Sequence, residues 1–112
     1  MNVLGWLTGR FSKRGKALLL YRRGMARSNR HDHPGAIDDY TTAIDMQDTP
    51  NDVKAMALYN RALVYAAVGD GSMATTDLDT VLEMTESPLN IKAEAKRKLV
   101  RMQSKSTKAG IE

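Results

Sequence analysis

The sequence predicts an all-α fold, a short α-solenoid of tandem helix-turn-helix hairpins with about five main helices plus a short N-terminal helix. Three observations predict it: the chain repeats itself, its apolar residues follow helical spacing, and turn residues separate the apolar runs at matching places. The chain has 112 residues, which is enough for one small domain. Stacked repeats of this size usually present a binding surface rather than a catalytic pocket.

The repeat is visible when residues 16–50 are laid over residues 54–88, at an offset of 38. Eleven of the thirty-five positions are identical, whereas ordinary composition gives about two by chance. In the first copy the identical residues are Lys16, Ala17, Leu20, Tyr21, Arg23, Asp32, Ala36, Asp39, Thr42, Met46 and Pro50. The chain therefore contains a duplicated unit.

Within each copy the apolar residues recur at steps of three and four, as they do on one face of a helix. In the second copy one apolar stripe precedes the turn residues Gly69-Asp70-Gly71 and another follows them. The first copy predicts helices over Leu18–Ala26 and Pro34–Met46, with a turn at residues 29–33 between them. Each copy is therefore expected to be a pair of amphipathic helices.

The residues at the expected helix starts also repeat. Thr49-Pro50 and Ser87-Pro88 stand at the same offset of 38, and a hydroxyl followed by proline favours a helix N-terminus. We expect these hydroxyls to accept a backbone N–H. The chain after Pro88 predicts a capping helix over 89–104 with a polar outer face, followed by a flexible tail at 105–112. The two repeat units then span residues 17–50 and 51–88.

Charge is distributed in three blocks along the chain. Residues 1–31 hold eight Lys or Arg and no acid, residues 32–90 hold two bases and eleven acids, and residues 91–112 hold seven bases and two acids. Solvated surfaces account for such blocks, but the order also favours pairing between molecules or docking on an acidic partner. The few aromatic residues and the acidic middle argue against a nucleic-acid binder.

Composition also bounds the environment of the protein. The chain has no cysteine, which excludes disulfides and thiolate metal sites. It has no apolar run near the roughly 20 residues needed to cross a bilayer. The apolar stretch at residues 3–7 is too short for a secretory signal. We therefore expect a cytoplasmic protein.

The residues at the helix–helix contacts carry a family resemblance. Small and large residues alternate at fixed places in both copies: Gly24, Ala36, Tyr40 and Ala43 in the first, and Ala62, Ala74, Leu78 and Val81 in the second. This pattern resembles the tetratricopeptide repeat, two tandem units with a C-terminal capping helix. Arg27 departs from it, since the family has an aromatic residue at that place.

The resemblance implies a concave groove lined by the first helices of successive units, and a non-catalytic protein-protein interaction module that binds a peptide or partner helix there. The groove residues that it implies are Leu18, Tyr21, Arg22, Met25, Ser28, Asn29, Met56, Tyr59, Asn60, Leu63, Ala66, Ala67, Glu94, Arg97, Lys98 and Arg101. An apolar floor flanked by cations suits a partner with aliphatic anchors and acidic character. The alternative is that these side chains only pack between helices or under the N-terminal segment.

Residues 1–16 precede the repeats and combine apolar side chains, including the single tryptophan Trp6, with four bases. This is the pattern of a short amphipathic docking helix. We expect it to cover the first unit, because an end of a repeat stack needs a cap. The alternatives are a homodimer, in which residues 1–11 dock on a second copy, and binding to an anionic membrane surface.

Other chemistry-bearing residues do not form a recognisable site. His31-Asp32-His33 lies in a predicted turn without further metal ligands nearby, and Asp32 recurs as Asp70, which indicates bonding to the local backbone. The carboxylates of Asp38-Asp39 and of Asp77 and Asp79 are expected on solvated helix faces. No nucleophile, phosphate loop or triad accompanies them, so we predict no catalysis, no metal and no cofactor.

Overall fold

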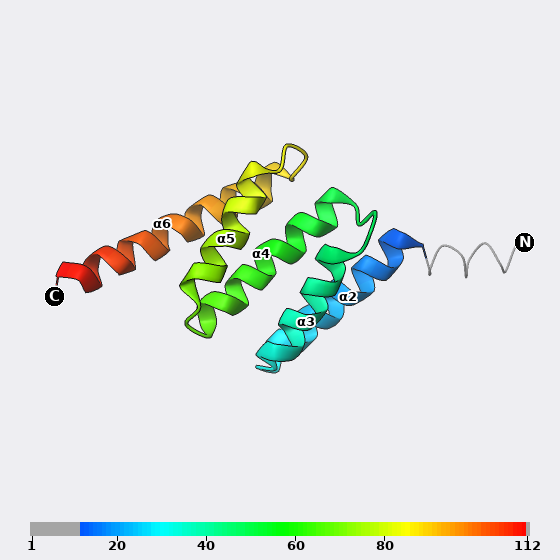
Figure 1. Cartoon of the computed structure of the whole chain (residues 1–112), viewed down its shortest axis with the longest axis horizontal. Coiled ribbons are helices and arrows are strands. Elements are labelled where there is room, and N and C mark those ends of the chain that lie inside the picture. Colours follow the sequence, from blue (N-terminus) through cyan, green and yellow to red (C-terminus); the bar gives the residue numbers. More distant parts are fainter. Residues whose placement is uncertain (1–11, 112) are drawn as a thin grey trace, which may run out of the picture.

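The computed structural model describes residues 12–111, with side chains up to residue 107 (Figure 1). The helices are α2 (Lys13–Asn29), α3 (His33–Asp45), α4 (Asn51–Ala67), α5 (Gly71–Glu83) and α6 (Leu89–Ile111). No strand occurs between residues 12 and 111, which confirms the all-α prediction. None of these helices is both long and apolar enough to cross a membrane. The N-terminal helix expected within residues 1–16 falls largely on residues 1–11, outside the described part.

The five helices form two hairpins, α2–α3 and α4–α5, followed by α6 (Figure 1). Each helix packs against the next one along the chain, and α4 also contacts both α2 and α6. The first helices of the units thus form one continuous row. α2 begins before the expected Leu18, and α6 extends to Ile111, beyond the residue 104 where sequence reasoning ended the capping helix.

Both hairpin turns use the same local chemistry. The carboxylates of Asp32 and Asp70 accept hydrogen bonds from the backbone N–H groups of Gly35 and Met73, each at 3.1 Å, and so cap α3 and α5. This confirms the backbone role predicted for the two aspartates. One residue before each cap, His31 and Gly69 have positive φ angles of 62° and 87°, a left-handed geometry that commonly ends a helix.

The hydroxyls before the two prolines behave differently from the prediction. The Thr49 hydroxyl donates to the carbonyl oxygen of Ala43 at 2.7 Å, and α4 begins at Asn51, after the N-cap residue Pro50, without a side-chain cap. The Ser87 hydroxyl is buried and has no hydrogen-bond partner in the described structure. The prediction was wrong because the carbonyls that end the preceding helix are unpaired acceptors within closer reach of Thr49.

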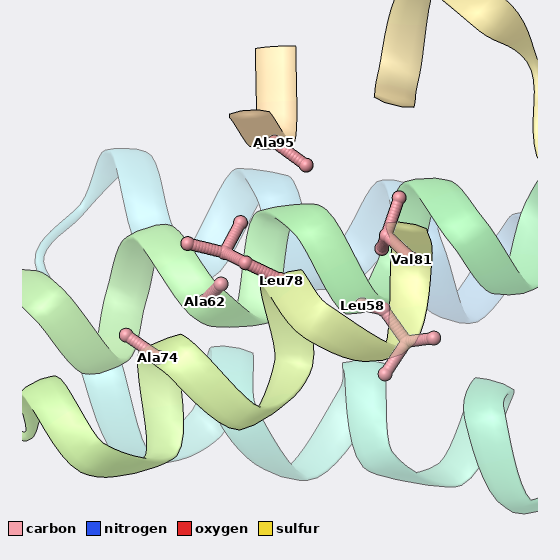
Figure 2. Packing of buried hydrophobic residues seen from close by; sticks show 6 residues of the cluster. All are labelled: Leu58, Ala62, Ala74, Leu78, Val81 and Ala95. Atoms are coloured by element: carbon pink, nitrogen blue, oxygen red, sulfur yellow. The ribbon is translucent and has the colours of Figure 1, made fainter. Parts of the chain in front are cut away.

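The described residues contain two clusters of buried apolar side chains, one between α3 and α4 and one among α4, α5 and α6. The first contains Ala36, Tyr40, Ala43, Ala57 and Val64, from α3 and α4. The second contains Leu58, Ala62, Ala74, Leu78, Val81 and Ala95, and Figure 2 shows Ala95 of α6 over the α4–α5 hairpin. Ile44 packs against both clusters. The helix pairs are therefore joined by a shared interior.

Two buried carboxylates correct the expectation of solvated acidic faces. Asp39 and Asp77 are each only 2% exposed. Asp39 accepts two hydrogen bonds from Arg23, at 2.9 and 2.8 Å, and Asp77 accepts two from Arg61, at 2.8 and 2.7 Å. A carboxylate can be buried when a guanidinium satisfies both of its oxygens, as the planar Arg fork does here. Asp38 and Asp79 are exposed, as expected.

The close approach of α2 and α3 depends on Gly24. A Cβ added there would lie 2.6 Å from Cε1 of Tyr40, whose ring is buried. We expect Gly24→Ala to lower the free energy of unfolding by about 1–2 kcal/mol, since overpacking of about 1–3 kcal/mol outweighs a helix-propensity gain of up to about 1 kcal/mol. Urea denaturation measures this loss.

The second unit supplies the control for this substitution. There the equivalent pair is Ala62 and Leu78, both fully buried. Tyr40→Leu introduced together with Gly24→Ala recreates that pair, so the double variant is expected to be more stable than the sum of the two single losses implies. Additive losses would show that the Gly24–Tyr40 contact does not limit the packing.

Candidate partner-binding groove

The main cleft of the described structure lies between α4 and the C-terminal half of α6. It encloses about 750 Å³. Its lining residues are Tyr59, Leu63, Ala66, Ala67, Gly69, Gly71, Lys98, Arg101, Met102 and Lys105. In Figure 1 the end of α6 extends past the α4–α5 hairpin, so no third hairpin partner fills this space within the described chain.

The cleft has an apolar floor and a cationic wall. Tyr59, Leu63 and Ala66 of α4 are partly buried and form the floor. Lys98, Arg101 and Lys105 of α6 stand at spacings of three and four, which places them along one helix face. This combination favours a ligand with apolar anchors next to carboxylates.

The Tyr59 phenol is neutral at physiological pH. Burial raises the pKa of Tyr59 above its ordinary value, and the Glu94 carboxylate raises it further, while Arg101 and Arg97 act in the opposite direction. A neutral phenol offers both an aromatic face and one hydroxyl donor to a ligand. The charge in the cleft therefore comes from α6 and not from its floor.

A second hollow lies on another side of α6. It encloses about 590 Å³ and is lined by Ala93, Lys96, Arg97, Val100 and Arg101. Val100 is 56% exposed. Arg101 lines both spaces, so the cationic wall of the main cleft continues around α6.

The predicted groove residues separate into two groups. Tyr59, Leu63, Lys98 and Arg101 line the main cleft together with Ala66 and Ala67, and Arg97 lines the hollow beside it. Neither space is lined by the first-unit residues Leu18, Tyr21, Arg22, Met25, Ser28 and Asn29, or by Met56, Asn60 and Glu94. The cleft thus combines the second unit with α6.

Asn60 and Tyr21 are held by contacts inside the molecule. The Asn60 amide donates to the Tyr21 hydroxyl at 3.1 Å and to the carbonyl oxygen of Met56 at 2.9 Å. Burial raises the pKa of Tyr21, while the hydrogen bond from Asn60 lowers it. Both amide hydrogens of Asn60 are in use, which leaves only its carbonyl oxygen to accept a bond from a partner. This pair therefore joins α2 to α4.

Sequence reasoning missed Met102 and Lys105 as cleft residues. Lys105 stands 38 positions after Ala67, a residue already placed in the groove. The same offset would have identified it, had the expected helix not ended at residue 104. Within residues 12–107, no group of three or more His, Asp or Glu side chains is arranged to hold a metal ion.

No protein-family model, curated protein or solved structure matches this chain.

Proposed function

We propose that this chain is a non-catalytic interaction module, an adaptor or assembly scaffold of the cytoplasm, built from two tetratricopeptide-like units and a capping helix. The observation that supports this most is the cleft of about 750 Å³ between α4 and α6, with its apolar floor and its three cations. The partner that fits it is an amphipathic helix or extended peptide with aliphatic anchors and neighbouring carboxylates.

The distribution of charge supports an acidic partner. The exposed acids Asp38 and Asp45 lie on α3, and Asp79 and Glu83 lie on α5. The cleft cations are all on α6. An acidic helix is therefore attracted to the α6 side of the cleft and repelled by the exposed acids of α3 and α5. These charges orient the partner as it docks.

Binding of a designed peptide tests the proposal. The probe is a helical peptide of about 15 residues with leucines at every third or fourth position, flanked either by Glu or by Lys. We expect the Glu peptide to bind at least about tenfold more tightly than the Lys peptide, because each charge pair across the rim adds to its affinity. Fluorescence anisotropy with labelled peptides measures both constants.

Two variants locate the binding to the cleft. Leu63→Glu is expected to weaken the Glu peptide at least about tenfold, since it puts a carboxylate on the apolar floor. Leu89→Glu is the matched control, because Leu89 is 84% exposed and lies outside the cleft. The proposal would be contradicted if Leu63→Glu and Leu89→Glu bound the Glu peptide with equal affinity. It would also be contradicted if the unmodified protein bound the Glu and Lys peptides with equal affinity.

A further inference from the structure

Among the described residues, none covers an apolar face of the first hairpin that lies away from the proposed partner cleft. Leu19, Leu20 and Met46 line a hollow of about 520 Å³, with Lys16 and Arg23 at its edge. Leu19 is 48% exposed. None of these residues belongs to the cleft between α4 and α6.

The second unit shows what covers this face when a preceding helix is present. Ala57, the residue equivalent to Leu19, is fully buried against Ala43 and Tyr40 of α3. Within residues 12–111, no helix precedes α2 to cover the Leu19 face as α3 covers the corresponding face of α4. Leucine in place of alanine makes the uncovered face more apolar, so exposure of this face to water is unfavourable.

The residues just before α2 fit this place in register. At the offset of 38, residues 1–7 correspond to residues 39–45, the second half of α3, and residues 8–12 correspond to the linker before α4. Gly5 then matches the small residue Ala43, and Trp6 matches Ile44, which packs against both core clusters.

The covalent connection also favours this segment over a separate partner. Residues 1–9 carry no charged side chain, and Arg10 is the one charged residue of the segment. The segment joins α2 directly at Ser12, whose side chain caps that helix. A tethered segment reaches an effective concentration near the millimolar range, which a free partner rarely matches.

We propose that residues 1–11 dock on the Leu19–Leu20–Met46 face of their own chain, with Trp6 taking the place that Ile44 has beside the second unit. This segment replaces the missing preceding helix. The partner cleft is left open at the other end of the stack, so the docking is independent of the proposed function.

Trp6 reports on this docking because it is the only tryptophan of the chain. In the full-length protein, acrylamide is expected to quench Trp6 fluorescence several-fold less than in a free peptide of residues 1–11. Leu19→Lys is expected to restore peptide-like quenching while the helical circular dichroism stays unchanged. The matched control Leu89→Lys changes an exposed leucine on α6 and is expected to leave Trp6 protected.

Three results would overturn the proposal. Peptide-like quenching in the wild-type protein would show that Trp6 is not covered. Protection that survives Leu19→Lys would place the segment on another surface. Protection that appears only as protein concentration rises, together with a doubled mass in solution, would assign the docking to a second copy.

Discussion

Arg61→Met is expected to lower the free energy of unfolding by about 3–5 kcal/mol, because it leaves the buried Asp77 carboxylate without a cation. The Arg61 side chain is itself only 13% exposed and donates to both oxygens of Asp77. Water cannot replace these bonds without opening the α4–α5 hairpin. Urea denaturation followed by circular dichroism measures the loss.

The first unit supplies a matched control, Arg23→Met. Asp39 keeps Arg27 when Arg23 is removed, since the Arg27 guanidinium lies 3.1 Å from both carboxylate oxygens. Arg23 is also 57% exposed, so its removal is expected to cost only about 1 kcal/mol. Equal losses for Arg61→Met and Arg23→Met would show that the second cation in the first unit does not compensate.

The double variant Arg61→Met/Asp77→Leu separates loss of the pair from an unpaired charge. Replacing both members of a buried pair by apolar residues is often close to neutral. The double variant is therefore expected to be more stable than Arg61→Met alone. A double variant that is less stable than Arg61→Met would mean that the cost of Arg61→Met does not come from leaving the Asp77 carboxylate unpaired.

Stability is expected to fall at high pH through ionisation of Tyr40. Burial, followed by the charges of Tyr21 and Asp39, raises the pKa of Tyr40 from 10.0 to about 12. The folded state therefore favours the neutral phenol, and its contribution is complete below the unfolded pKa of 10.0. It is lost as pH rises through about 12, a decrease of about 2–3 kcal/mol at about 1.36 kcal/mol per unit.

The control for this pH dependence is Tyr40→Phe, which keeps the ring and removes the ionisable hydroxyl. All other ionisable groups are the same in both proteins, so the difference between the two stability curves isolates Tyr40. Urea denaturation at several pH values between about 9 and about 12.5 gives both curves and brackets the unfolded and folded pKa values. Parallel curves would contradict the prediction.

The hairpins were predictable because their chemistry is local and is repeated. Asp32 and Asp70 each cap a helix within three residues, and Gly24 or Ala62 admits the facing helix at the same place in both copies. The offset of 38 then assigned each residue a structural equivalent. The same repetition placed Tyr59 and Leu63 on one face of the stack, and both line the cleft between α4 and α6.

The buried ion pairs were missed although the sequence contains a signal for them. Arg23 and Asp39 are separated by 16 positions, and so are Arg61 and Asp77. An opposite charge kept at one spacing in both copies indicates a pair inside the hairpin. Sequence reasoning assigned the carboxylates to solvated faces because helical periodicity alone does not show that a guanidinium from the facing helix reaches them.

The first-unit groove residues could not be placed from a single repeat pattern. Tyr21 bonds to Asn60, and Met25 packs against the Tyr40 cluster, so both are used within the stack. Whether the groove face of a first helix stays accessible to a partner depends on which later helix packs against it. Here the open end is at α6, where the chain supplies no second helix within the described residues.

The position of Ile44 couples the unfolding of the two hairpins. Its side chain packs against both core clusters, and Arg61 of the second hairpin donates to the Thr41 hydroxyl of the first at 2.9 Å. Nearest-neighbour interfaces of this kind make the melting of one repeat costly for the next. We therefore expect the two hairpins to unfold cooperatively, in a single transition, with neither persisting as an independent folding unit.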